Sequence, residues 1–288
     1  MPAIGNWVKA KLGILDRFVT DKEALNNQVL RVQGNAGYHN SIYRGKDLGT
    51  SVTDEMYAAI TAGTFDNLFV GDYFTINGTI YRIAGFNLIK NCGDSVNVGN
   101  NMCLVPDNAL YTAQMHNTES GNYEPGAVAN DTTGAYANSD MRTTNLSRAT
   151  NKIITDFGSS HVISYRDTLT NVTANGQASN WLWYDCKVEL MSEVMVDGTK
   201  VWGNSGYEVG CLNEQFPLFR LNPESIHIRS YYWLRSVGSA ETFTSMDSTG
   251  RASSTGASYQ LGVRPFFFVA EDASQTVIQA IDEEYLID

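Results

Sequence analysis

The chain has 288 residues, of which 43% are hydrophobic and 18% charged, and its formal net charge is -11. This composition supports a sizeable hydrophobic core and excludes wholesale disorder. A chain with this negative charge repels the phosphate backbone of nucleic acids. We therefore expect no nucleic acid as a partner. No stretch approaches the roughly 20 apolar residues of a membrane-spanning helix, so we expect no membrane insertion.

Residues 7–33 have the spacing of an amphipathic helix, and Gly34 is a suitable stop. The apolar stripe consists of Leu15, Phe18, Leu25, Val29 and Val32. This helix either packs on its own domain or serves as a docking or coiled-coil segment, and the sequence leaves both open. We therefore set residues 1–33 apart as an N-terminal helical segment for anchoring or oligomerisation.

The next elements carry clear local signals. Thr53 or Ser51 can cap a short helix that Gly63 ends. Two apolar runs then flank Asn77-Gly78, the strongest short-range signal for a β-hairpin. Residues 107–140 are rich in Asn, Thr, Ser and Gly and predict a long surface loop.

Residues 138–157 predict one helix or two short ones, with Ser139 or Asn138 as the cap and Gly158 after the end. From residue 162 onward, short apolar runs alternate with turns, including a hairpin turn at Asp247–Gly250. The pattern predicts an α+β fold with a twisted antiparallel sheet and long loops.

The run "LGVRPFFFV", residues 261–269, resembles a buried strand but contains Arg264 and Pro265. Proline has no N–H for a sheet ladder, so Pro265 is expected at the start of a strand or at a bulge. A buried arginine is costly unless it is paired, so Arg264 is expected to clamp several carbonyls or a carboxylate.

The sequence offers no catalytic constellation. None of the common nucleophile, zinc or phosphate-loop motifs occurs, and the four histidines are scattered. Acidic residues such as Asp140, Asp185, Glu189 and Glu193 could pair in space. The four cysteines match no metal spacing and are expected to be free, mostly buried thiols. We expect no enzymatic activity, no cofactor and no metal.

Aromatic residues are numerous, with 15 Tyr, 12 Phe and 5 Trp, and many stand beside Ser, Thr, Asn and Gly. Such a mixture is typical of adaptable binding surfaces. The alternative is that large rings fill the core of a loop-rich domain, which applies to Trp181, Trp183, Trp202 and Trp233 and which we expect of Trp233. Three tyrosines fall in the polar loop, and for these a second interpretation is exposure and contact with a partner: Tyr111, Tyr123 and Tyr136.

The motifs "YYWLRSV" and "LGVRPFFFV" together resemble the ending of a family of C-type-lectin-like domains in bacteria and tailed bacteriophages. The upstream pieces "GYHNSIYRGKDLG" and "GTFDNLFVGDYFTINGTIYRIAGF" are similar to a phage version. The resemblance implies a C-type-lectin-like domain over residues 34–270. It also implies structural roles for Trp233, Arg235, Arg264 and Pro265.

In related ligand-binding members, contacts come from the stretch between the two motifs. The resemblance therefore implies ligand contacts at Glu241, Thr242, Phe243, Thr244, Met246, Asp247 and Tyr259. There is no W-N-D motif of the sugar-binding, calcium-dependent lectins. Residues 271–288 form an acidic C-terminal tail, either solvated or docked on a neighbouring subunit.

The resemblance implies a structural protein of a tailed bacteriophage particle, located in the virion and assembled in the host cytoplasm. Its partners would be other virion proteins, further copies of itself in a homo-oligomer, and a host cell-surface glycan or protein. The alternative is a decoration or scaffold protein of the capsid, neck or tail without a ligand of its own.

Overall fold

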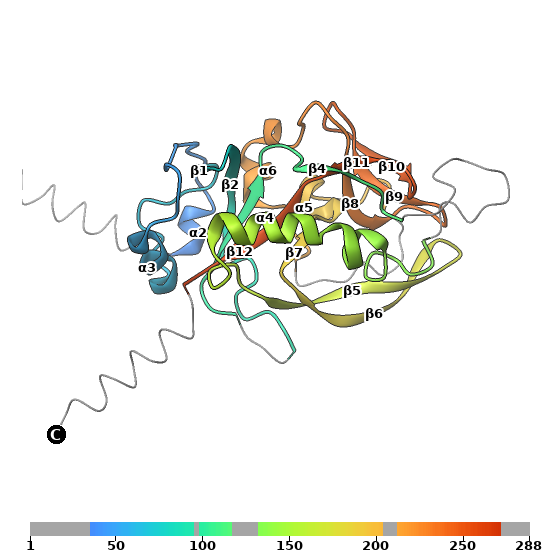
Figure 1. Cartoon of the computed structure of the whole chain (residues 1–288), viewed down its shortest axis with the longest axis horizontal. Helices are drawn as coiled ribbons and strands as arrows, with labels where there is room; N and C mark the ends of the chain where they lie inside the picture. Colours follow the sequence, from blue (N-terminus) through green and yellow to red (C-terminus); the bar gives the residue numbers. More distant parts are fainter. Residues whose placement is uncertain (1–34, 95–97, 117–131, 204–211, 272–288) are drawn as a thin grey trace, which may run out of the picture.

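A computed structural model describes residues 35–94, 98–116, 132–203 and 212–271. The expectations for the N-terminal segment 1–33, and for the acidic tail apart from Glu271, lie outside these residues. The described part combines mostly antiparallel sheets with a few short helices (Figure 1). The predicted α+β class is confirmed.

The first sheet has five strands in the order β1-β2-β3-β12-β7, and its pairings are antiparallel. The strands are β1 (Tyr73–Ile76), β2 (Thr79–Phe86), β3 (Met102–Pro106), β12 (Pro265–Val269) and β7 (Val188–Leu190). Asn77 and Gly78 have φ angles of 46° and 77°, the left-handed values that a tight hairpin turn requires. The predicted hairpin is confirmed.

The second sheet has the order β10-β9-β8-β11-β4. Its strands are β10 (Ala252–Gly256), β9 (Thr242–Met246), β8 (Tyr232–Val237), β11 (Leu261–Val263) and β4 (Tyr111–Ala113). One pairing is parallel, with Gly262 opposite Tyr232. The predicted turn between β9 and β10 is confirmed, since Asp247 N–H donates to the Arg251 carbonyl at 2.9 Å.

The chain passes directly from the second sheet into the first at residues 261–269. β12 pairs with β3 in the first sheet, and β11 pairs with β4 in the second. Only Arg264 separates β11 from β12, so the run at residues 261–269 belongs to both sheets. Pro265 is the first residue of β12, as its missing N–H requires. We call this crossing the Arg264 junction.

A third sheet is the hairpin of β5 (Tyr165–Ala174) and β6 (Gln177–Cys186). Its tip packs against the loop before β9, because a Cβ on Gly176 would lie 2.2 Å from the Ala240 nitrogen. Thr132 also donates its backbone N–H to the Ala240 carbonyl at 3.2 Å. The tip is therefore held by the rest of the domain.

Short helices complete the described chain. They are α2 (Ala36–His39), α3 (Asp54–Ala62), the π-helix η1 (Met141–Asn145), α4 (Ser147–Phe157), α5 (Glu193–Asp197), α6 (Pro217–Leu221) and the 3-10 helix η2 (Pro223–Ser225). The predicted cap and stop of α3 are confirmed: the Thr53 side chain accepts from Met56 N–H, and Gly63 is left-handed. Ser139 Oγ accepts from Arg142 N–H ahead of α4, and Gly158 follows its end.

The prediction of one long surface loop over residues 107–140 is wrong for the described part of that range. The range contains β4, and Ala135, Tyr136 and Ala137 are buried. Tyr136 is drawn inside because its hydroxyl donates to Glu189 at 2.6 Å and accepts from Leu190 N–H at 3.0 Å. It is therefore not a surface contact, while Tyr123 lies outside the described residues.

The prediction that Trp233 fills the core is confirmed, and the other three tryptophans that we considered for the core are not fully buried. Trp181 is 39% exposed and Trp202 is 54% exposed, and Trp183 is half-buried. Trp181 and Trp183 lie on β6 of the two-stranded sheet, whose side chains are not covered by a second layer on both faces. The exposed rings offer apolar surface to a partner.

The expectation of four free thiols is also corrected. Cys103 and Cys186 are free and buried, as expected, but Cys92 is disulfide-bonded. Cys211 lies outside the described residues. None of the helices in the described ranges has both the length and the apolar character needed to cross a membrane.

Candidate functional site

The Arg264 junction satisfies a buried guanidinium with backbone carbonyls. Arg264 is 1% exposed, and it donates from Nε to the Pro106 carbonyl at 2.9 Å. Its Nη1 donates to the Ile226 carbonyl at 3.1 Å and its Nη2 to the Ser225 carbonyl at 2.9 Å. The cation also lies 5.2 Å from the centroid of the Tyr232 ring. This is the geometry that a structural clamp requires.

The other motif residues are interior as well. Trp233 is fully buried and donates its indole N–H to the Ala113 carbonyl at 2.9 Å. Arg235 is 5% exposed and faces Asp167 at 3.4 Å, a long ion pair between two buried groups. Together with Arg264 and Pro265, these residues hold the sheets together and present no binding surface.

The seven predicted ligand contacts divide into two groups. Phe243, Thr244 and Met246 are buried on β9, so their side chains pack inside the domain, and we withdraw them from the contact set. Successive side chains of a strand point to opposite faces of the sheet, so this burial means that both faces of β9 are covered. The remaining four, Glu241, Thr242, Asp247 and Tyr259, are exposed or half-buried.

The surface that remains follows the edge strand β10. The residues that flank β10, Arg251 and Ala257, bond to Asp247 and Glu241, which flank β9. The alternation of the ladder therefore directs the backbone N–H and C=O groups of Ser254 outward. At one end of β10, Trp202 donates its indole N–H to the Ala252 carbonyl at 3.0 Å. At the other end, Tyr259 is 55% exposed. We call this strand with its two flanking rings the β10 edge.

Hydroxyl groups connect the β10 edge to β9. Ser254 Oγ donates to Thr242 Oγ1 at 2.7 Å, and Thr242 Oγ1 also lies 2.8 Å from Ser239 Oγ. On the other face of the pair, Ser245 and Thr255 hydroxyls lie 2.8 Å apart. Hydroxyls can donate and accept, so the edge can exchange these bonds for bonds to a ligand.

The sequence reasoning missed Trp202 as a surface residue. Its neighbours in "VWGNSGY" are Gly, Asn and Ser, which are loop residues and would have indicated exposure. In the structure, the loop is fixed because the buried Glu193 carboxylate accepts from the N–H groups of Trp202 at 2.9 Å and Gly203 at 2.7 Å. This anchor presents the indole beside Ala252.

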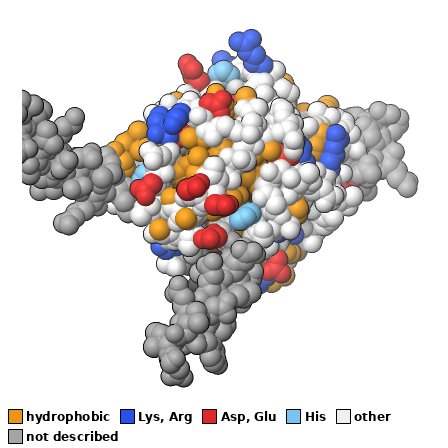
Figure 2. Space-filling view, turned by 60° about the vertical axis from the view of Figure 1, so that its left-hand side comes forward, with side chains coloured by type: hydrophobic (Ala, Val, Ile, Leu, Met, Phe, Trp, Pro, Cys, Tyr) orange, Lys and Arg blue, Asp and Glu red, His pale blue; other side chains and the backbone are white. Residues whose placement is uncertain are grey.

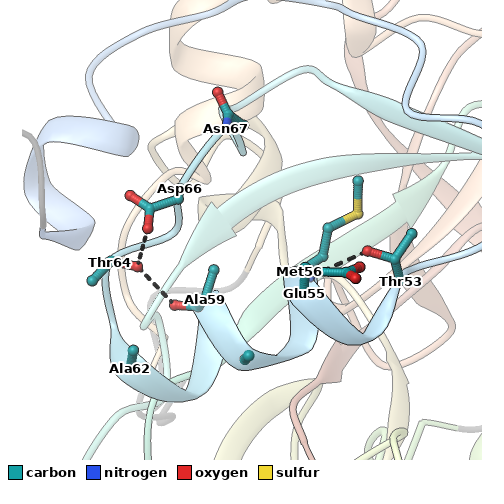
Figure 3. A pocket seen from close by; sticks show the side chains of 9 residues that line it. Thr53, Glu55, Met56, Ala59, Ala62, Thr64, Asp66 and Asn67 are labelled. Carbon is teal, nitrogen blue, oxygen red and sulfur yellow. Dashed lines mark hydrogen bonds between the residues drawn. The ribbon is translucent and has the colours of Figure 1, made fainter.

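A separate apolar groove of about 610 Å³ follows α3 (Figure 3). Ala59, Ala62 and Met56 line it, and the Thr64 hydroxyl at its end bonds to Asp66 at 3.0 Å. Figure 2 shows hydrophobic side chains bordered by Asp and Glu side chains on the side where α2 and α3 lie in Figure 1. The groove offers apolar contact area.

A cluster of titratable groups is closed inside the domain. Glu189 accepts from Arg142 Nε at 3.0 Å and from the Tyr136 hydroxyl at 2.6 Å. Burial, and then the charge of Glu189, raises the pKa of the nearby Cys186 thiol far above its ordinary value. Cys186 is therefore a protonated thiol rather than an activated nucleophile at neutral pH.

Among the residues that the structure describes, no three His, Cys, Asp or Glu side chains converge as a metal site. The exposed chemistry of the β10 edge consists of two rings, a row of hydroxyls and free backbone groups. Such a surface can stack on and hydrogen-bond to a ligand.

Comparison with known proteins gives no relative. No protein-family model matches the sequence, and neither a curated protein nor a solved structure shows significant similarity to it.

Proposed function

We propose that this chain is a structural protein of a tailed bacteriophage particle that displays a C-type-lectin-like domain for adhesion to a host surface. The "WLRS" and "GVRP" motifs support the family, since "WLRS" lies on β8 and the first two residues of "GVRP" lie on β11, which pairs with β8 in the second sheet. In this proposal the protein resides in the virion, contacts other virion proteins and further copies of itself, and binds a host glycan or surface protein.

The β10 edge is the observation that carries the adhesive role. It combines two exposed rings, Trp202 and Tyr259, with half-buried hydroxyls and a charge-free strand. Exposed aromatic rings beside small polar residues supply contact area at low entropic cost. Natural edge strands are usually protected by charge or proline, and β10 carries neither.

Binding to host cells tests the proposal. Purified protein should bind the cells and slow adsorption of the particle. The double variant Trp202→Ala/Tyr259→Ala should bind at least about tenfold more weakly. Trp181→Ala is the matched control, because it removes an exposed tryptophan from β6 instead. Equal binding by both variants would place the contact elsewhere, and absence of binding by the unaltered protein would end the adhesive role.

The location of the chain in the particle separates the adhesin from a decoration or scaffold protein. Electron microscopy of particles labelled through this chain should place it at a fibre or baseplate tip if it adheres to the host. A position on the capsid or neck, with no binding to cells, would instead establish the scaffold role.

A further inference from the structure

The apolar groove along α3, which we call the α3 groove, has the lining of a helix-docking site. Its volume is about 610 Å³, and its apolar lining consists of Met56, Ala58, Ala59 and Ala62. Ala58 and Ala62 are exposed and four residues apart, so they form one row on the helix surface. Small side chains in such a row let a second helix pack with its axis about 8 Å away. A helix with an apolar stripe therefore fits this groove.

The N-terminal segment joins the described domain at one end of the α3 groove. Asn67 lies at that end (Figure 3). α2 packs on the residues that follow it, because the ring centroids of Tyr38 and Phe69 are 6.0 Å apart. Asn35 caps α2, so residues 1–34 are attached beside the groove.

Charge distinguishes the two terminal segments as occupants. Glu55 and Asp66 are exposed in the lining, and the described residues that line the groove include no Lys or Arg. Residues 1–33 hold five Lys and Arg against three Asp and Glu, whereas residues 272–288 hold five Asp and Glu and no basic residue. The negative rim therefore attracts the N-terminal segment and repels the acidic tail.

Part of the apolar stripe in the N-terminal segment matches α3 in length. Leu25, Val29 and Val32 are spaced by four and three residues and cover about 10 Å of helix. The nine residues of α3 cover about 14 Å. Because the segment is attached at the Asn67 end, these three side chains can follow the groove with the two helices running in the same direction.

We infer that the α3 groove binds the chain's own N-terminal segment through Leu25, Val29 and Val32. Attachment beside the groove gives the segment an effective concentration in the millimolar range, which favours it over a second copy. Lys22 precedes Leu25 by one helical turn and therefore faces Glu55 in the first turn of α3. The inference goes beyond the adhesive function and does not rest on it, because the α3 groove and the β10 edge share no residue.

Carbodiimide cross-linking of the full chain tests this placement. The reagent joins a lysine amine to a carboxylate in contact with it, so Lys22 should be linked to Glu55. When unlabelled and isotope-labelled chains are refolded together, each linked pair should come from one chain. Links between differently labelled chains would assign the groove to a second copy and contradict the inference. The absence of any link from Lys22 to α3 would also overturn it.

Blocking the groove should release the segment. An isolated amphipathic helix is marginal in water, so slow amide exchange in residues 25–32 depends on docking. The variant Ala58→Arg/Ala62→Arg places two long cations in the groove and should speed this exchange at least about tenfold. The matched control Asn151→Arg/Thr155→Arg places the same two side chains four residues apart on the exposed face of α4 and should leave it unchanged.

A second variant tests the contact from the segment, without changing any residue of the described domain. Leu25→Ser/Val29→Ser should speed amide exchange in α3, while exchange in β12 stays unchanged because the domain remains folded. Unchanged exchange in α3 would contradict the inference. Faster exchange of residues 272–288 in Ala58→Arg/Ala62→Arg, with residues 25–32 unaffected, would overturn it in favour of the acidic tail.

Discussion

The Arg264 junction, which the two large sheets share, and the β10 edge of the second sheet differ in where their polar groups lie. At the junction, a charged side chain is 1% exposed, and three carbonyls accept its hydrogen bonds. Along β10, five small neutral residues are half-buried, and the Ser254 backbone groups point outward. The hydrogen bonds of the junction are made inside the domain, whereas the edge presents polar groups at the surface to a partner. Removal of a polar group should therefore reduce stability at the Arg264 junction and reduce binding at the β10 edge.

The largest effect is expected from Arg264→Ala. The substitution leaves the carbonyls of Pro106 and Ser225 without this donor, at about 1–3 kcal/mol for each buried unsatisfied group, while the Ile226 carbonyl keeps the Tyr232 hydroxyl at 2.8 Å. A domain is stable by only about 5–15 kcal/mol, so the variant should be largely insoluble or unfolded. Soluble yield and urea unfolding measure the loss.

Two further arginine variants sharpen this prediction. Arg251→Ala removes an exposed arginine from the turn next to β10 and should change stability by less than about 0.5 kcal/mol. Arg264→Lys keeps the charge but not the planar fork, and should fall between the two. A normally stable Arg264→Ala protein that has lost only binding would make the junction a functional site.

Gly262→Ala should have the next largest effect. A Cβ at this position would lie 2.7 Å from Ala109 Cβ and 2.9 Å from the Tyr231 carbonyl oxygen, so β11 must move away from its neighbours. Overpacking of this kind costs about 1–3 kcal/mol, measured as a lower urea midpoint. Gly99→Ala is the control, since nothing lies within 4 Å of its Cβ position. Equal stability of the two variants would show that the junction tolerates displacement.

Trp202→Phe tests the anchor of the β10 edge. The change removes the indole N–H that bonds to the Ala252 carbonyl but keeps an aromatic ring. We expect a loss of about 0.5–1.5 kcal/mol in the free energy of unfolding, because one hydrogen bond disappears at an exposed site. Hydrogen exchange should rise in residues 252–256 and stay unchanged in residues 265–269. Uniform exchange across both strands would mean that the two regions are not independent.

The smallest effect is expected at Asp247. A hydrogen bond from the Arg251 N–H, with further bonds from Thr249, lowers the pKa of this carboxyl below its ordinary value of 3.8. The stabilisation is therefore complete above about pH 4 and is lost as pH falls through the lower folded pKa. Asp247→Asn should cost less than about 0.5 kcal/mol at pH 7, because solvent screens the site.

Urea unfolding of the unaltered protein and of Asp247→Asn, measured between pH 7 and pH 2.5, checks this prediction. The difference between the two should shrink below pH 4. Glu241→Gln removes a charge from the same hairpin without touching the turn, and should show no such trend. A difference that grows on acidification would reverse the sign of the effect.

Local features of the fold were predictable, and features that depend on remote partners were not. The turn at Asn77-Gly78 and the ends of α3 follow from a few adjacent residues. The sequence also indicated that Arg264 needs several partners, but not that they come from residues as distant as Pro106 and Ser225.

The errors arose where tertiary contacts override composition. Tyr136 stands in a polar stretch but is buried, because Glu189 and Leu190 bond to its hydroxyl. Trp202 was a candidate for the core, yet its loop is anchored on the surface by Glu193. For the candidate site, the sequence indicated the stretch around β9 and β10 but not which side chains are exposed. That depends on how the two faces of β9 are covered in the folded domain.

The sharing of residues 261–269 between two sheets has a consequence for the order of folding. β12 lies between β3 and β7, and β11 lies between β8 and β4, so removal of this run divides both sheets. A ribosome makes these strands after all their partners, and long-range pairings are slow to form. Until β11 and β12 have been made, the strands on either side of them have no partner on that edge. Each of the two large sheets therefore lacks one of its interior strands until residues 261–269 have been made, and neither sheet can be completed before then.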